Sequence, residues 1–261
     1  MHVIVTMSAK GGVGKSTLAR GLISAAAHKG LRTGFVETDR SRATYLWARD
    51  AHAAGYWDTG IQGYAAGSVE TLEATIVALD AAAEQDGGVG DDATPPLDLL
   101  VVDTAGDRSP MQEFLLGGAD LVLVPINLTR IAMLTSLETA SHIYTVIRDN
   151  PDAHVAKLRG VVNQRPRELT EILQTVRTYL AAPDLLTDEN GANATAFPLL
   201  ELEIRERNAY REMESKGLLH KIVEAYDAPR LRLRQKHFAD ALAEMEALLE
   251  ACLAEIERAN A

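Results

Sequence analysis

The sequence contains very little cysteine, few aromatic residues and no long apolar segment. Of its 261 residues, only one is cysteine and 5% are aromatic. Cys252 therefore has no partner for an internal disulfide, and its place on the apolar side of a late helical pattern predicts a small core residue rather than a reactive thiol. No apolar run reaches the roughly 20 residues that a membrane-spanning helix needs, and no secretory signal pattern opens the sequence. These absences predict a cytoplasmic protein.

Motifs of several enzyme classes are absent as well. The seven histidines are scattered, and no group of cysteines and histidines has the spacing of a metal site. Paired cysteines, which an ATPase that carries metal clusters would need, are missing. No motif of a nucleophilic catalyst is present, and no Asn-Lys-x-Asp motif indicates a GTPase. The chemistry must therefore come from another part of the sequence.

Negative charge dominates the chain but is unevenly distributed. The net charge is −11, which argues against a surface that binds nucleic acid all over. Residues 80–107 contain eight acidic residues and no Lys or Arg, whereas residues 228–237 contain four basic residues and no acid. We consider these four as candidate contacts to DNA phosphates: Arg230, Arg232, Arg234 and Lys236. A solvated helix face that pairs with nearby acids is an equal alternative.

Short runs of Val and Leu alternate with longer helical patterns along the whole chain. This alternation predicts one α/β domain, residues 1–261, with a mainly parallel sheet flanked by helices on both faces. The expected strands cover 3–7, 33–37, 61–65, 97–103, 120–125, 157–163 and 195–200. The expected helices cover 15–29, 44–54, 69–83, 129–148, 167–181, 204–215, 217–226 and, as a long C-terminal helix, 230–258. The acidic, glycine-containing segment 85–96 predicts an exposed loop within the domain.

A glycine-rich loop between the first strand and the first helix is the strongest motif. It reads Ala9-Lys-Gly-Gly-Val-Gly-Lys-Ser-Thr17, and its backbone N–H groups and the helix N-terminus are suited to surround phosphate oxygens. Lys15 would neutralise the β- and γ-phosphates, and the Ser16 hydroxyl would ligate Mg²⁺. Ala9 stands where the motif usually has its first glycine, but the flanking strand and helix favour a phosphate loop over a chance turn. The residues predicted to bind the nucleotide are Lys10, Gly11, Gly12, Val13, Gly14, Lys15, Ser16 and Thr17.

The second lysine of this loop, Lys10, defines a deviant form of the motif. The loop resembles that of the ParA/MinD family of ATPases. Looser similarities in residues 39–47, 125–129, 163–166, 206–213 and 216–220 resemble one subgroup, the ParA-like VirC accessory ATPase of T-DNA transfer and its plasmid-partition relatives. The similarity covers nearly the whole chain.

This resemblance implies a slow ATP-dependent switch in a bacterial cytoplasm. ATP and Mg²⁺ would close a homodimer, in which Lys10 reaches the partner's ATP. The dimer would bind DNA with little sequence preference, which could place it on the nucleoid, and hydrolysis would reopen it. A protein activator or a DNA-processing complex would be a further partner. The implied role is the positioning of plasmid or chromosomal DNA, or of a conjugative DNA-transfer complex.

Acidic residues at two strand ends complete the predicted site. Asp103 follows an apolar strand, where its carboxylate can hold Mg²⁺ through water, and Gly106 leaves the next N–H free to sense the γ-phosphate. Asp39 matches the second acid of the family's Asp-x-Asp strand end, so the resemblance implies that it helps to hold magnesium water and positions the attacking water. A simple turn residue is the alternative for Asp39. Glu37 replaces the first acid, which weakens that part of the resemblance.

The residue that recognises the base is less clearly marked. Asn163 follows a predicted strand at a position where many relatives place an adenine-binding residue. A cap of the following turn is an equal alternative for its side chain.

The end of the chain argues against membrane binding. An apolar stripe in the last helix faces an acidic side, which an anionic bilayer would repel, so the stripe should pack on the protein or on a partner helix. The stripe consists of Phe238, Leu242, Met245, Leu249, Cys252 and Ile256. Two other functions stay open: an ATPase that recruits a protein complex without binding DNA, and a P-loop enzyme with a small-molecule substrate.

Overall fold

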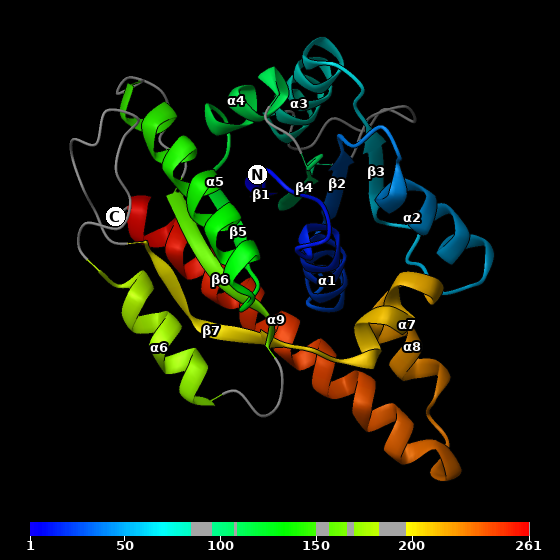
Figure 1. Cartoon of the computed structure of the whole chain (residues 1–261). Helices are drawn as coiled ribbons and strands as arrows, with labels where there is room; N and C mark the ends of the chain where they lie inside the picture. The colour runs from blue at the N-terminus through cyan, green and yellow to red at the C-terminus, as the bar shows by residue number, and fades with distance from the viewer. Residues whose placement is uncertain (85–95, 107–108, 150–156, 166–169, 183–196, 261) are drawn as a thin grey trace.

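The computed structural model has a seven-stranded sheet between two layers of helices (Figure 1). The structure describes residues 1–84, 96–106, 109–149, 157–165, 170–182 and 197–260. The strands are β1 (His2–Thr6), β2 (Thr33–Glu37), β3 (Gln62–Ala65), β4 (Leu99–Asp103), β5 (Leu121–Ile126), β6 (Lys157–Arg165) and β7 (Leu199–Arg205). Their order across the sheet is β3-β2-β4-β1-β5-β6-β7, and all described strand pairs are parallel. The predicted fold class is confirmed.

Helices cover both faces of the sheet because both faces of its strands are apolar. Successive strand residues point to opposite faces, so Ile4 joins one hydrophobic cluster and Val5 joins the other. The first cluster packs under α1 (Lys15–His28), α2 (Ala43–Ala53), α7 (Asn208–Lys216), α8 (Leu219–Ala225) and α9 (Arg232–Asn260). The second packs under α3 (Val69–Glu84), α4 (Pro110–Leu116), α5 (Arg130–Asp149) and α6 (Thr170–Leu180).

The long helix α9 lies along α1 and buries its apolar stripe on the body of the protein (Figure 1). At the crossing, a Cβ on Gly21 would come within 2.4 Å of Met245 Sδ, so the missing side chain allows the two helices to approach closely. Cys252 is fully buried in this interface, and burial raises the pKa of its thiol. The predictions of a packed stripe and an inert thiol therefore agree with the structure. Among the described helices, none combines the length and the apolarity needed to cross a bilayer.

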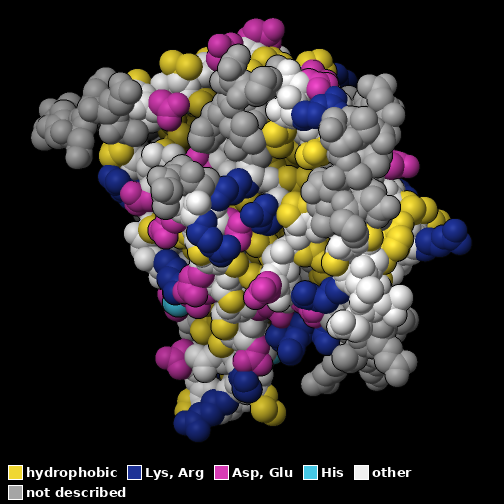
Figure 2. Space-filling model, turned by 90° about the vertical axis from the view of Figure 1, so that its left-hand side faces the viewer, with side chains coloured by type: hydrophobic (Ala, Val, Ile, Leu, Met, Phe, Trp, Pro, Cys, Tyr) yellow, Lys and Arg dark blue, Asp and Glu magenta, His cyan; other side chains and the backbone are white. Residues whose placement is uncertain are grey.

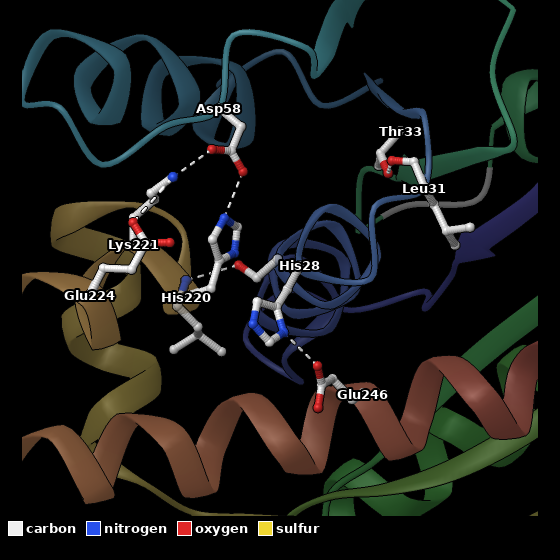
Figure 3. A network of polar contacts seen from close by, with 10 residues as sticks. His28, Leu31, Thr33, Asp58, His220, Lys221, Glu224 and Glu246 are labelled. Atoms are coloured by element: carbon white, nitrogen blue, oxygen red, sulfur yellow. Dashed lines mark hydrogen bonds and ion pairs between the residues drawn. The ribbon is translucent and has the colours of Figure 1, made fainter. Parts of the chain in front are cut away.

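A polar network ties α8 to α1, to α9 and to the loop before β3 (Figure 3). His220 Nε2 lies 2.6 Å from Asp58 Oδ2, and its ring stacks on that of His28 with the ring centroids 5.5 Å apart. His28 in turn contacts Glu246 of α9 at 2.6 Å. Burial acts to raise the pKa of Asp58, but hydrogen bonds from Lys221 and His220 outweigh it and hold this pKa below its ordinary value. The network fixes α8 beside α1.

The predicted secondary structure needs correction in three regions. The last strand, expected over 195–200, is β7 and runs from Leu199 to Arg205, so the start of the helix expected over 204–215 is strand. Charged residues alternate with apolar ones in this edge strand, so the strand continues past its predicted end at Leu200. Helix α4 was not predicted, although Pro110 after Ser109 is a common helix start. The C-terminal helix begins at Arg232 after a 3₁₀ turn, Pro229–Leu231, rather than at residue 230. The loop predicted over 85–96 lies outside the described residues except for Pro96.

Candidate nucleotide-binding site

The loop between β1 and α1 leaves the N-terminus of α1 open. Gly14 precedes the first residue of the helix with φ +97°, and Gly12 has φ +80°, both in the left-handed region that favours glycine. No side chain in the described part of the protein caps the first turn of α1. The backbone N–H groups of this turn are therefore available to an anion, as the sequence predicts for a phosphate loop.

Two other elements hold the loop in this shape. Asn163, at the end of β6, is fully buried and donates its Nδ2 to the Val13 carbonyl at 3.0 Å. A Cβ on Gly14 would lie 2.0 Å from the same nitrogen, so only glycine lets Asn163 approach. On the other side, Thr139 of α5 accepts a hydrogen bond from the N–H of Ala9 at 3.0 Å. Asn163 thus contacts the phosphate loop itself; its predicted role in binding adenine stays a prediction.

The two lysines of the loop lie in different environments. Lys15 is only 7% exposed, and its Nζ donates to the Lys10 carbonyl at 3.1 Å, which keeps the ammonium group at the loop. The Lys10 side chain is exposed and forms no ion pair with the described part of the chain. This division fits a residue that binds phosphate in its own loop and another that is free to reach a second molecule.

Asp103 lies at the end of β4, beside the loop. The register aligns it with Thr6 of β1 and with Glu37 of β2, so the carboxyl ends of three strands meet here. Its Oδ2 accepts a hydrogen bond from the Thr44 hydroxyl at 2.6 Å, while its Oδ1 is buried and has no hydrogen-bond partner among the described residues. Burial raises the pKa of Asp103, and the hydroxyls of Thr44 and Ser16 act against this rise.

An unpartnered, buried carboxylate oxygen close to a serine hydroxyl fits a magnesium site. Buried polar atoms are nearly always hydrogen-bonded, so Asp103 Oδ1 indicates a missing partner. Mg²⁺ typically uses one or two carboxylates together with substrate phosphates rather than a cage made only of protein. Accordingly, the described residues contain no group of three or more His, Cys, Asp or Glu that could hold a metal ion by themselves.

Glu37 organises the loop that carries Asp39. Its carboxylate is buried and accepts the N–H groups of Asp39 at 2.9 Å and of Thr44 at 2.8 Å. Burial and the nearby Asp103 raise the pKa of Glu37 to about 7. Asp39 itself is half-buried, and its Oδ1 accepts the N–H of Ser41 at 2.8 Å. Glu37 therefore holds the backbone of this loop, and Asp39 is the acid that stays accessible.

Gly106 brings the segment after β4 against the phosphate loop. A Cβ at this position would lie 2.8 Å from the nitrogen of Gly11 and 3.0 Å from the Lys10 carbonyl carbon, so a larger residue would push the two segments apart. Next to this contact lies a cleft of about 460 Å³, whose lining includes Asp39, Ser68 and Gly106. The structure thus assembles the predicted loop residues with Asp39, Asp103, Gly106 and Asn163.

The predicted DNA-binding residues lie elsewhere, in the 3₁₀ turn before α9 and in the first residues of α9, beyond α8 (Figure 1). Arg234 pairs with Glu212 at 2.9 Å and lies 4.7 Å from the centre of the Tyr226 ring, and Lys236 pairs with Asp240 at 2.7 Å. Arg230 and Arg232 are exposed and form no ion pair within the described residues. On the face shown in Figure 2, basic side chains are interspersed with acidic ones rather than forming a continuous basic surface.

The sequence did not reveal three buried polar residues that form hydrogen bonds around the site. These are Arg20 in α1, Thr44 in α2 and Thr139 in α5. Arg20 and Thr44 are polar residues at buried positions of otherwise apolar helix faces, and this is the signal that could have revealed them.

Comparisons with known proteins agree with this geometry. The model of the VirC1 protein family matches residues 1–258. Protein virC1 of Rhizobium rhizogenes is 25% identical over 246 residues, which are 94% of each chain. Protein ParA of Rhizobium radiobacter is 32% identical over 126 residues, 48% of this chain and 49% of that protein.

A solved structure shows the same fold over nearly the whole length. The MinD cell division protein of Aquifex aeolicus superposes with a TM-score of 0.56 at 19% identity, covering 96% of this chain and 97% of that one. At this identity the likeness concerns the fold alone. Together with the sequence relatives, it confirms the predicted resemblance to ParA/MinD-type ATPases and to their VirC subgroup.

Proposed function

The chain belongs to the VirC1 family of ParA/MinD-like P-loop ATPases, and from this premise we propose that it is an ATP- and Mg²⁺-dependent switch that dimerises and positions DNA or a DNA-transfer complex. The observation that carries the proposal is the open phosphate loop, which has one buried and one exposed lysine. Beside this loop lies Asp103 Oδ1, a buried oxygen that has no hydrogen-bond partner among the described residues. A cytoplasmic location, with association to the nucleoid, would follow from DNA binding.

The residues of the loop would bind and orient the nucleotide. Lys15 and the N–H groups of residues 11–17 would hold the phosphates, while Ser16 and Asp103 would hold Mg²⁺. When bound, Mg²⁺ would neutralise charge on the β- and γ-phosphate oxygens. Asp39 would hold the attacking water in line with the γ-phosphate, and the segment at Gly106 would contact the γ-phosphate through its backbone. Asn163 would recognise adenine.

Features on the same edge of the sheet support dimerisation. Lys10, which is exposed and forms no ion pair within the described residues, is suited to reach a nucleotide held by a second copy. Near the start of α5, which follows the carboxyl end of β5, Ile131 is 69% exposed and Leu134 is 44% exposed. Large apolar side chains exposed beside a ligand site favour coverage by another protein surface.

Replacement of Asp39 with alanine should leave ATP binding intact and lower turnover about 10²- to 10⁴-fold, the usual contribution of a group that positions or deprotonates a nucleophile. Binding would be measured by calorimetry and turnover by phosphate release. Asp50→Ala, which removes an exposed acid of α2, is the matched control and should hydrolyse ATP at the wild-type rate. Wild-type turnover in Asp39→Ala would remove Asp39 from this role.

A gel shift on random duplex DNA tests the proposed partner. Binding should require ATP and should weaken with salt, by about 40-fold between 50 and 200 mM for three phosphate contacts and by more for a dimer. Changing Arg230, Arg232 and Arg234 to Glu should abolish it. The control variant carries Glu at Arg49, Arg211 and Arg258, whose side chains are 64%, 70% and 68% exposed, and should still bind. Equal binding by both variants would exclude the start of α9 as the contact.

A second function is favoured by the ion pairs of Arg234 and Lys236, which occupy half of the basic stretch with neighbouring acids. In this version the ATP-dependent dimer recruits a protein complex and does not itself bind DNA. Absence of a gel shift in every nucleotide state would select it over the first.

A further inference from the structure

A buried arginine lies behind the phosphate loop. Arg20 is one turn beyond Ser16 in α1 and is only 7% exposed. Its Nε donates to Thr44 Oγ1 at 3.1 Å, and its guanidinium carbon lies 5.4 Å from the centre of the Trp47 ring. A buried charge is costly unless it is paired, yet within the described chain Arg20 forms no ion pair. The nearby carboxylates that offset its charge include that of Asp103, so Arg20 lies within electrostatic reach of the predicted metal site.

The bond between Arg20 and Thr44 fixes the direction of a second hydrogen bond. A threonine hydroxyl has one proton to donate, whereas the Nε of arginine can only donate. Thr44 Oγ1 must therefore accept from Arg20, and its own proton is left for Asp103 Oδ2 at 2.6 Å. This leaves Asp103 Oδ1, buried and without a partner among the described residues, as the oxygen available to a ligand.

Thr44 also connects the acidic residue at the end of β2 with the one at the end of β4. Its backbone N–H donates to Glu37 Oε2 at 2.8 Å, while Glu37 Oε1 accepts the N–H of Asp39 at 2.9 Å. One residue at the start of α2 therefore links the loop of Asp39 to the carboxylate of Asp103, and Arg20 connects this residue to the helix of the phosphate loop.

We propose that Arg20 is a positioning residue of the metal–nucleotide site, which acts through the Thr44 hydroxyl to fix the Asp103 carboxylate with Oδ1 free for Mg²⁺. This inference rests on the proposed function, because it presupposes that the loop binds ATP together with Mg²⁺. Arg20 itself touches neither nucleotide nor metal. It acts on the carboxylate through an oriented hydroxyl group.

Dependence on the Thr44 hydroxyl group separates positioning from simple electrostatics. If Arg20 acted only as a positive charge, on the metal or on the Asp103 carboxylate, Arg20→Met would change Mg²⁺ binding by the same factor with and without that hydroxyl group. If it orients Thr44, its removal should weaken Mg²⁺ binding only where the hydroxyl group is present. A purely structural role, through packing on Trp47, would lower thermal stability and leave the Mg²⁺ response unchanged.

The test measures ATP binding by calorimetry, once with EDTA and once over a series of Mg²⁺ concentrations. Loss of a group that supports a metal ligand typically lowers metal affinity or activity about 10- to 100-fold. We expect Thr44→Val and Arg20→Met each to raise the half-saturating Mg²⁺ concentration within that range. ATP binding in EDTA should stay at the wild-type level, because Lys15 and the loop amides are unchanged. Thr44→Ser, which keeps the hydroxyl, is the matched control and should respond like the wild type.

The double variant Arg20→Met/Thr44→Val should be no weaker in Mg²⁺ binding than Thr44→Val alone, because both changes interrupt the same link. Additive losses, or an unchanged or tighter Mg²⁺ response in Arg20→Met, would overturn the inference while leaving the proposed function intact. If Arg20→Met does not fold, Arg20→Gln replaces it, because Gln is uncharged and its Nε2 can donate to Thr44 in place of the arginine Nε. Positioning predicts a Mg²⁺ response close to the wild type, and a response as weak as that of Thr44→Val would refute positioning. A wild-type protein that binds no ATP with or without Mg²⁺ would refute the proposed function itself.

Discussion

Lys15→Ala should abolish nucleotide-dependent dimerisation. Lys15 is the buried lysine of the phosphate loop, with its Nζ bonded to the Lys10 carbonyl, so its charge is held where the phosphates would bind. Removing one partner of a close, desolvated charge pair costs about 2–5 kcal/mol, which corresponds to a roughly 30- to 5,000-fold loss of affinity for ATP. Light scattering with ATP and Mg²⁺ should then show only monomer. An intact ATP-dependent dimer would count heavily against the mechanism.

Lys10→Ala is the matched control, because it removes a lysine from the same loop. The Lys10 side chain is exposed and forms no ion pair with described residues, so ATP binding by the monomer should persist at near the wild-type level. Only the dimer should be lost, since the proposed contact of Lys10 is with the nucleotide of the partner. If Lys10→Ala lost ATP binding as completely as Lys15→Ala, the two lysines would share one role, and the division between them would be wrong.

The sheet was predictable because most of its strands are continuous apolar runs. β1, β4 and β5 are buried on both faces and read as short runs of Val, Leu and Ile. β7 was misplaced because it is an edge strand, in which Glu201, Glu203 and Arg205 alternate with apolar residues. Because these charged residues interrupt the apolar run, the sequence marks the strand end at Leu200, and the pairing with β6 that extends it to Arg205 is not visible in the sequence.

The residues of the site were predictable only where a local sequence pattern marks them. The phosphate loop is a local motif, and the strand ends marked Asp39 and Asp103. The supporting contacts join residues far apart: Thr44 is 59 positions from Asp103, and Asn163 is 150 positions from Val13. Their pairing follows from the order of the strands, which local spacing does not encode. For that reason the role of Thr44, and the contact of Asn163 with the loop, required the structure.

The close contact between Asn163 and the loop makes Gly14 difficult to replace. In Gly14→Ala, the residue would keep a left-handed φ of +97°, a strain of about 1–2 kcal/mol for a residue with a Cβ. The new Cβ would lie 2.0 Å from Asn163 Nδ2 and would displace a buried amide from its bond to Val13, at a further cost of about 1–3 kcal/mol. We expect urea unfolding to show a stability loss of roughly 2–5 kcal/mol and calorimetry to show weak ATP binding.

Gly55→Ala separates the strain from the clash. Gly55 has φ +80°, similar to Gly14, but a Cβ there would meet nothing within 4 Å, so only the strain of about 1–2 kcal/mol should appear, with ATP binding unchanged. Shortening the opposing side chain offers a second comparison, because Asn163→Ala removes the atom that the new Cβ would strike. Gly14→Ala should therefore cost less stability in the Asn163→Ala background than in the wild type. Equal losses in both backgrounds would show that Asn163 does not hold the loop, and the contact between Asn163 and Gly14 would be refuted.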